Sequence, residues 1–364
     1  PEDRFAWVQR RIAESPDEIR DSASFGFVGF CRDSEKVQTT MKELDQKVEE
    51  LRKADSNFAP YESRWEQATR FANGAEDEDD DYKPVITEEM LRAQPMDAVV
   101  LIGGCDKTVP AQMMGAASAG LPAIQLITGS MLTGSHRNQR VGACTDCRRY
   151  WAMYRSEAID EDEIHEVNDQ LVASVGTCSV MGTASTMACL AEAMGLTVPG
   201  GASPPAVTAD RMRVAEETGK QAVWLARERL GITRILDERA LENGMRVLLA
   251  IGGSTNAIVH LAAIAGRLGF ELDLKALDRM GQQTPVLLDL KPSGEHYMED
   301  FHAAGGMATL LRELKPLLHL DALTVTGRTL GEEIDRAGPG FAQDVVRPLH
   351  QPIYPQGGLA VLQG

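Results

Sequence analysis

Short apolar runs alternate with longer segments of helical spacing in most of the chain. Residues 98–102 and 121–127 are apolar runs bounded by turn residues, which predicts two strands. Strands that alternate with helices are typical of parallel sheets whose strands are joined by crossover helices. The pattern therefore predicts an α/β fold with parallel sheets. Helical spacing is found in three later segments, 208–230, 238–250 and one that begins with a cap at Ser254 or Thr255.

Residues 1–94 are denser in charge and poorer in long apolar runs than the rest of the chain. Within them, residues 25–30 predict a strand and residues 41–51 a helix. The six consecutive acidic residues 76–81 predict a solvated loop, since a calcium site would need a glycine-centred loop. We divide the chain into a charged N-terminal segment, an α/β domain and the start of a truncated C-terminal domain, at 1–94, 95–350 and 351–364, and expect a strand to begin within 357–362.

The amino-acid composition limits the kinds of molecule that the chain can bind. The formal charge is -17, from 54 acidic and 37 basic residues, and it repels the phosphates of nucleic acids and anionic membranes. No apolar stretch approaches the roughly 20 residues that span a bilayer, and the first residues do not resemble a secretory signal. Six cysteines in 364 residues do not form a disulfide scaffold, so reduced thiols are expected. We expect a cytoplasmic protein that binds neither nucleic acid nor membrane.

Two glycine-flanked turns that each carry a cysteine are the most informative chemical feature. Cys105, Asp106 and Lys107 follow the first predicted strand, and Cys178 lies in a later turn that opens a helix. Cysteine thiolates suit iron or zinc, whereas a carboxylate suits magnesium. Iron with an open position can assist the departure of a hydroxyl, and magnesium can hold a carboxylate, so this set suits the dehydration of a hydroxy acid. A charged lysine repels a metal, so Lys107 is equally compatible with a surface ion pair.

Other residues carry weaker alternatives. Cys144 and Cys147 have the spacing of a redox pair, but a zinc site would need a second pair of ligands. Cys189 falls within a helical pattern and is expected to be a buried structural thiol. Two further pairs suit either substrate contact or a purely structural role, namely Asn256 with His260 on one helix face, and Lys291 with Ser293 in a turn where a sugar-acid carboxylate could be held.

Five motifs, in this order, resemble those of the dihydroxy-acid and sugar-acid dehydratases. They are GCDKTVP at 104–110, the segment 176–190 with its Gly-Thr-Cys and Thr-Ala-Ser-Thr-Met wording, GLTVPG at 195–200, IGGSTNA at 251–257 and LKPSG at 290–294. The resemblance covers about residues 85–364. The residue sequence of the second motif is most similar to that of the pentonate (arabinonate and xylonate) dehydratases.

The resemblance implies the N-terminal α/β domain of a dehydratase, with the C-terminal β-barrel-like domain largely absent, and an active site between the two domains in a homo-oligomer, a dimer or a tetramer. It implies that Cys105 and Cys178 ligate an iron–sulfur cluster, usually 2Fe-2S, and that Asp106 and a carbamylated Lys107 bind Mg2+. The substrate would be a sugar acid or a related 2,3-dihydroxy acid. Loss of its C2 proton and C3 hydroxyl would give a 2-keto-3-deoxy acid.

This chain departs from the family pattern in three places. The third cluster cysteine has no match in residues 32–41, where Cys31 is the nearest thiol. A Gly-Glu-Thr turn that supplies a magnesium ligand is absent, with Glu66 the nearest substitute, and the family's base serine would lie beyond Gly364. The first hypothesis is therefore an iron–sulfur hydro-lyase, and the alternative is a catalytically incomplete member that acts as a scaffold or partner-binding subunit. A zinc or redox protein built on Cys144 and Cys147 would leave the other motifs unexplained.

Overall fold

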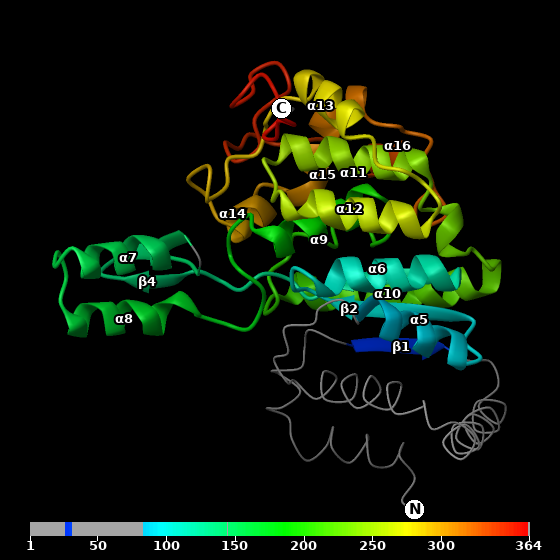
Figure 1. Cartoon of the computed structure of the whole chain (residues 1–364), viewed down its shortest axis with the longest axis horizontal. Coiled ribbons are helices and arrows are strands. Elements are labelled where there is room, and N and C mark those ends of the chain that lie inside the picture. The colour runs from blue at the N-terminus through cyan, green and yellow to red at the C-terminus, as the bar shows by residue number, and fades with distance from the viewer. Residues whose placement is uncertain (1–25, 31–82, 144, 363–364) are drawn as a thin grey trace, which may run out of the picture.

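A three-stranded sheet lies at one side of the described part of the molecule (Figure 1). The computed structural model describes residues 26–30, 83–143 and 145–362. The strands are β1 (Gly26–Phe30), β2 (Ala98–Gly103) and β3 (Ala123–Ile127), in the order β1-β2-β3. β1 runs antiparallel to β2, whereas β2 and β3 are parallel, with Val99 opposite Ala123 and Gly103 opposite Ile127. The predicted α/β class is confirmed, and the crossover of parallel strands is the β2–β3 connection.

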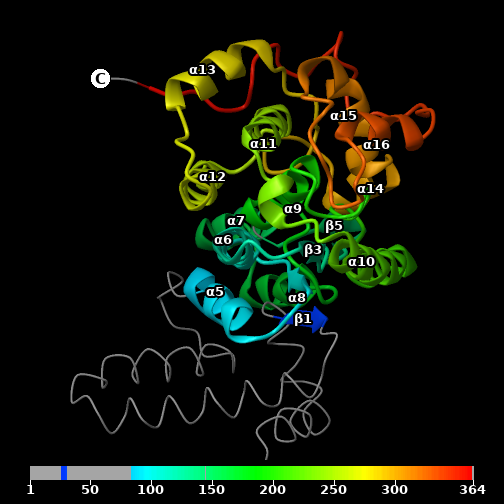
Figure 2. The same cartoon turned by 90° about the vertical axis from the view of Figure 1, so that its right-hand side faces the viewer.

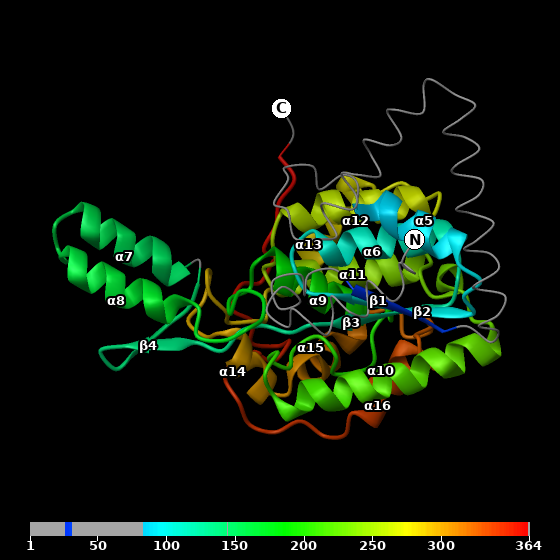
Figure 3. The same ribbon diagram turned by 90° about the horizontal axis from the view of Figure 1, so that it is seen from below.

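Helices cover both faces of this sheet. α6 (Thr108–Ala119) connects β2 to β3, and it ends at Gly120, whose φ of 73° is the left-handed conformation common at helix ends. α5 (Lys83–Ala93) packs against α6, and α10 (Ala209–Glu228) packs against β2 and β3. Figures 2 and 3 show α6 and α10 on opposite sides of the sheet. β2 and β3 are therefore buried on both faces, which explains their continuous apolar sequence.

α9 (Thr183–Ala193) lies at the centre of the remaining helices and is almost entirely buried. It contacts α11, α12, α15 and α6. Its residues are small or apolar except for Glu192, so neighbouring helices can approach it closely. The elements around it are η2 (Ile232–Arg234), α11 (Glu238–Ala250), α12 (Asn256–Arg267), α13 (Leu274–Gln283), α14 (Met298–Ala303), α15 (Gly306–Leu314), η3 (Lys315–Leu317) and α16 (Leu330–Arg336).

Residues 134–171 form an arm that projects from the body (Figures 1 and 3). The arm consists of the hairpin β4 (Gly134–His136) and β5 (Gln139–Val141) and the helices α7 (Thr145–Arg155) and α8 (Glu161–Leu171). It has a small core of its own, formed by Val141, Tyr150, Ile164, Val167 and Leu171. The arm is thus a separate packing unit, and its position depends on the polar contacts at its base.

The predicted strands at 25–30, 98–102 and 121–127 are confirmed as β1, β2 and β3, and the helices expected at 208–230 and 238–250 are confirmed as α10 and α11. The cap before α12 is shared: Thr255 occupies the cap position without a side-chain bond, and the Ser254 hydroxyl accepts the Asn256 N–H. The domain boundaries at 94 and 350 stay predictions. The helix at 41–51, the acidic run 76–81, Cys31, Glu66 and Cys144 lie outside the described residues.

The prediction of a strand within 357–362 is wrong, because these residues form no strand. The Gly357 N–H binds the Gly281 carbonyl at 2.7 Å, and the Gly358 N–H binds the Leu249 carbonyl at 3.0 Å. The backbone therefore satisfies its donors on the ends of α13 and α11 instead of on a neighbouring strand. Among the described helices, none combines the length and apolar character needed to cross a membrane.

Candidate active site

Three loops meet at the carboxyl end of the parallel strands. β2 leads into Gly104, and β3 leads into Thr128, whose N–H binds the Gly103 carbonyl at 3.1 Å. A Cβ on Gly104 would lie 1.8 Å from Thr128 Oγ1 and 3.0 Å from Thr177 Cγ2. The loop that contains Thr177 therefore lies directly against the end of β2, and glycine at 104 is what permits this approach.

The Cys178 turn is fixed by its backbone. The Thr177 N–H binds the Gly129 carbonyl at 3.0 Å, and the Thr177 carbonyl accepts the Met131 N–H at 2.8 Å. Gly176 adopts a φ of 131°, and a Cβ there would lie 2.4 Å from Met131 N. Only glycine fits this position, which lets the turn bring Cys178 to the sheet edge.

Cys105, Asp106 and Lys107 lie between β2 and α6, as the sequence predicts. The Cys105 side chain is exposed, and its Sγ donates to Asp106 Oδ1 at 3.4 Å. Lys107 is exposed at the N-cap position of α6. The N-terminus of a helix carries a partial positive charge, which favours anionic ligands and thiolates nearby.

The contact between Gly104 and Thr177 brings the turns of Cys105 and Cys178 to the same edge of the sheet. Two thiols from adjacent turns, with a carboxylate beside one of them, fit part of a cluster and metal site. Two buried hydroxyls at this edge, those of Thr108 and Ser130, have no hydrogen-bond partner in the described part of the chain, as expected of groups that meet a ligand or water. Within the same residues, no group of three His, Cys, Asp or Glu side chains is close enough to hold a metal ion.

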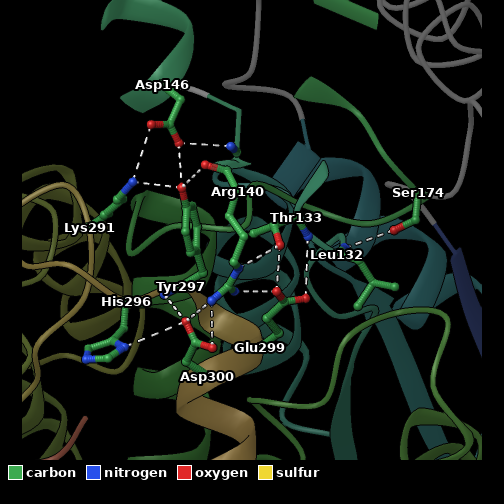
Figure 4. A network of polar contacts seen from close by, with 11 residues as sticks. Leu132, Thr133, Arg140, Asp146, Ser174, Lys291, His296, Tyr297, Glu299 and Asp300 are labelled. Carbon is green, nitrogen blue, oxygen red and sulfur yellow. Dashed lines mark hydrogen bonds and ion pairs between the residues drawn. The ribbon is translucent and has the colours of Figure 1, made fainter. Parts of the chain in front are cut away.

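A buried polar network joins Asp146 of the arm to Lys291 and Tyr297 of the body (Figure 4). The Tyr297 hydroxyl donates to Asp146 Oδ2 at 2.7 Å, and Lys291 Nζ donates to the Tyr297 hydroxyl at 2.7 Å and to Asp146 Oδ1 at 3.3 Å. Burial would raise the pKa of Asp146, but the bonds from Tyr297, the Gly142 N–H and Lys291 outweigh it and leave that pKa below 3.8. Asp146 therefore holds the base of the arm as an anion.

The same network reaches the backbone around Cys178. The Met181 N–H binds the Lys291 carbonyl, and the Met298 N–H binds the Ser179 carbonyl, both at 2.8 Å. Lys291 thus supports the turn from behind with its backbone, while its ammonium binds Asp146 and Tyr297. The structural alternative for Lys291 is the one that these contacts support.

A second set of charges lies beside this network at the base of the arm. Arg140 donates two bonds of 3.0 Å to the Asp300 carboxylate and another to Glu299. Burial lowers the pKa of Arg140, but the bonds to Asp300 and Glu299 outweigh it and raise that pKa above its ordinary value. Glu299 Oε1 also accepts the Thr133 hydroxyl at 2.6 Å. These contacts join β5 and the segment that leads to β4 with α14.

The remaining candidates have mostly structural surroundings. Cys189 is fully buried, and burial raises the pKa of its thiol, which confirms the expectation of a structural thiol. Asn256 Nδ2 donates to Thr183 Oγ1 at 3.3 Å, so it connects the starts of α12 and α9. Ser293 lies exposed in the predicted turn, and Cys147 is half-buried in the first turn of α7.

Sequence reasoning missed Asp146, Tyr297 and Arg140. Asp146 lies between Cys144 and Cys147, and the spacing of these two cysteines indicates a redox pair, not a structural carboxylate. A buried carboxylate needs donors, and two of the donors to Asp146, Lys291 and Tyr297, lie about 150 positions later in the chain. The sequence offered no local signal for this pairing.

Comparison with known proteins agrees with the motifs. The family model for the dihydroxy-acid/6-phosphogluconate dehydratase N-terminal domain matches residues 84–333. The chain is 43% identical over 279 residues to L-arabinonate dehydratase of Rhizobium leguminosarum bv. trifolii, and 42% identical over 281 residues to 6-deoxy-6-sulfo-D-gluconate dehydratase of Pseudomonas putida. Each match covers 76% of this chain and 48% of the relative.

A third relative extends the range of named substrates. Dihydroxy-acid dehydratase 1 of Methanosarcina acetivorans is 39% identical over 280 residues, which cover 76% of this chain and 50% of that protein. The chain thus spans about half the length of the curated relatives it matches. The resemblance predicted from the five motifs is confirmed. The chain belongs to the dihydroxy-acid/6-phosphogluconate dehydratase family, whose N-terminal domain it contains.

Proposed function

We propose that this chain forms the cluster-bearing part of a hydro-lyase that converts a sugar acid, or a related 2,3-dihydroxy acid, to a 2-keto-3-deoxy acid. The observation that carries the proposal is the contact between the Gly104 and Thr177 loops, which presents Cys105 and Cys178 at one sheet edge. The names of the relatives, which include a sugar-acid and a dihydroxy-acid dehydratase, support the substrate class.

In this proposal, Cys105 and Cys178 ligate an iron–sulfur cluster, of the 2Fe-2S type, and Asp106 and a carbamylated Lys107 hold Mg2+. These groups, when bound, supply the Lewis acidity that helps the C3 hydroxyl to leave and that neutralises the substrate carboxylate. Ligation requires deprotonated thiols, so the Cys105 proton, which now faces Asp106, must be released.

The chain's own residues contribute position and charge. The start of α6 places Lys107 and Asp106 beside Cys105, and the backbone bonds of Thr177 fix the second thiol. A preorganised arrangement of this kind lowers the cost of orienting the substrate during the reaction. The loss of the C2 proton needs a base, which we do not assign to any described residue. We expect the protein to act as a homo-oligomer, a dimer or a tetramer, as the family resemblance implies.

A scaffold role is the second candidate, and one observation favours it. Among the described residues, no three potential ligands come together, so the site needs ligands from elsewhere in the chain or from a partner. A catalytically incomplete member would keep the fold and the contacts at the base of the arm without holding a cluster.

Anaerobic purification with iron and sulfide quantification separates the two candidates. The hydro-lyase is expected to be brown, with near-stoichiometric iron and sulfide, and Cys105→Ser and Cys178→Ser are each expected to bleach it. Cys147→Ser, which changes a half-buried thiol on the arm, is the matched control and should keep the colour. Release of 2-keto-3-deoxy acid from a panel of pentonates and hexonates then tests the reaction. A colourless, folded wild-type protein would favour the scaffold.

A further inference from the structure

Two buried ionisable side chains, a glutamate and an arginine, bind one loop next to the candidate site. Glu192 on α9 and Arg211 on α10 are each only 5% exposed. One Glu192 oxygen accepts the Gly200 N–H at 2.7 Å, and the other accepts the Ala202 N–H at 2.8 Å. The carboxylate thus binds the loop through two backbone donors.

Arg211 binds the same loop through its carbonyls. Its Nη1 donates to the Gly201 carbonyl at 2.7 Å, and its Nη2 donates to the Pro204 carbonyl at 2.6 Å. A buried charge is costly unless it is paired and its hydrogen bonds are satisfied. Four backbone groups within residues 200–204 bind the two side chains, whereas Arg211 Nε has no hydrogen-bond partner among the described residues. The two side chains and the loop therefore hold one another in place through these four bonds.

The loop in turn supports the end of β3. The Ala206 N–H binds the Ser130 carbonyl at 2.8 Å. A Cβ on Gly129 would lie 2.6 Å from the Pro204 carbonyl oxygen and 2.8 Å from Ala206 N, and the φ of Gly129 is 95°. The loop and residues 129–130 are therefore in direct contact, with no room for a side chain between them.

Residues 129–131 carry both backbone bonds of Thr177, the neighbour of Cys178. We propose that Glu192 and Arg211 are positioning residues for Cys178: they fix the loop 200–206, the loop fixes residues 129–131, and these hold Thr177. The proposal rests on the proposed function only in treating Cys178 as a cluster ligand. The coupling itself is a property of the polypeptide and can be measured without a cluster.

The test is the alkylation rate of Cys178 in the full chain prepared without a cluster, resolved by peptide mass spectrometry, with Cys147 as the internal reference. Glu192→Gln replaces one of the two carboxylate oxygens that accept loop N–H groups. Arg211→Lys replaces the guanidinium, whose two Nη atoms bind two loop carbonyls, with a single ammonium. Asn243→Leu is the control, because Asn243 is also buried and also holds a remote segment, at His319, by two hydrogen bonds.

Each of the two variants is expected to raise the Cys178 rate about tenfold relative to Cys147, because weakening buried, charged hydrogen bonds makes local opening more frequent. Asn243→Leu should leave the ratio unchanged even if it lowers the melting temperature. Faster amide exchange in residues 200–206 with an unchanged Cys178 ratio would overturn the proposal. Failure of the wild type to take up a cluster would refute the proposed function and leave this result intact.

Hydrogen exchange of the wild-type chain gives a second measurement that needs no variant. If the loop and the turn open together, the amides of Ala202, Ala206 and Thr177 should report the same opening equilibrium within about threefold. An opening equilibrium for Thr177 that differs from the other two by more than about tenfold would show independent motion and overturn the coupling.

Discussion

Ser130 and Thr177 pair through a single parallel bridge, although neither belongs to a named strand. Ser130 lies shortly after the end of β3 at Ile127, so the bridge brings a distant segment to the carboxyl end of the sheet. Ligands collect at this end in open α/β sheets. The location of Cys178 is therefore a consequence of sheet geometry at one backbone contact.

Gly176→Ala tests this contact. The new Cβ would lie 2.4 Å from Met131 N and 2.5 Å from the Ser130 carbonyl carbon, at a φ of 131°. We expect the free energy of unfolding, measured with urea, to fall by more than about 1 kcal/mol. Gly266→Ala is the control, since no atom lies within 4 Å of its Cβ and the position is inside α12, where alanine adds up to about 1 kcal/mol. Equal effects of the two changes would contradict the close approach of Gly176 to Ser130.

Tyr297→Phe tests the polar connection between the arm and the body. The change removes the hydroxyl that donates to Asp146 and accepts from Lys291, and it leaves a buried carboxylate with one donor fewer. We expect a loss of about 1–3 kcal/mol in the free energy of unfolding. Tyr154→Phe, on the same arm, alters a ring that packs edge-on against Trp151 and should cost less. A loss no larger than that of the control would mean that the network does not stabilise the fold.

Asp106→Asn tests the magnesium part of the proposed site, with Mn2+ as the probe and electron paramagnetic resonance as the measurement. Mn2+ prefers carboxylate oxygens, as Mg2+ does, so the variant should bind at least about tenfold more weakly than the wild type. Asp169→Asn, which changes an exposed carboxylate on the arm, should not alter binding.

The same measurement of Mn2+ binding tests the proposed carbamate on Lys107. Added bicarbonate should strengthen Mn2+ binding by the wild type, because carbamylation converts a cation into an oxygen ligand, and Lys107→Arg should abolish that effect. Wild-type binding that is insensitive to bicarbonate would argue against a carbamylated Lys107.

Local sequence was sufficient for the first half of the site. The apolar run before Gly103 and the glycines after it predict a strand end, so Cys105, Asp106 and Lys107 could be located without knowledge of the fold. The sequence also indicated Cys178 as a candidate ligand. It could not show that Cys178 lies near Cys105, since the position of the Cys178 turn depends on the pairing of Ser130 with Thr177.

Long-range polar contacts were beyond sequence reasoning. Asp146 and Tyr297 are 151 residues apart, and neither has a periodic pattern that indicates a partner. Glu192 lies in a helix of small and apolar residues, where a single charge would be expected to face solvent. It is buried because the loop at 200–202 supplies two N–H groups, and that loop conformation has no sequence signal of its own.

The ionisation of Glu192 gives a pH-dependent prediction. Burial raises the pKa of Glu192 to about 7 from an ordinary 4.5, although the Ala202 and Gly200 N–H groups and Arg211 lower it. Between these two values the folded chain holds a proton that the unfolded chain has released, so the stability contributed by this group falls as the pH rises. The free energy of unfolding of the wild type, minus that of Glu192→Gln, should therefore decrease from about pH 5 to about pH 7 and then level off. The same difference for Asn243→Leu, which removes no ionisable group, should stay constant. A difference that stays constant over this range would mean that the Arg211 charge and the loop donors outweigh burial, so that Glu192 is ionised in both the folded and the unfolded chain.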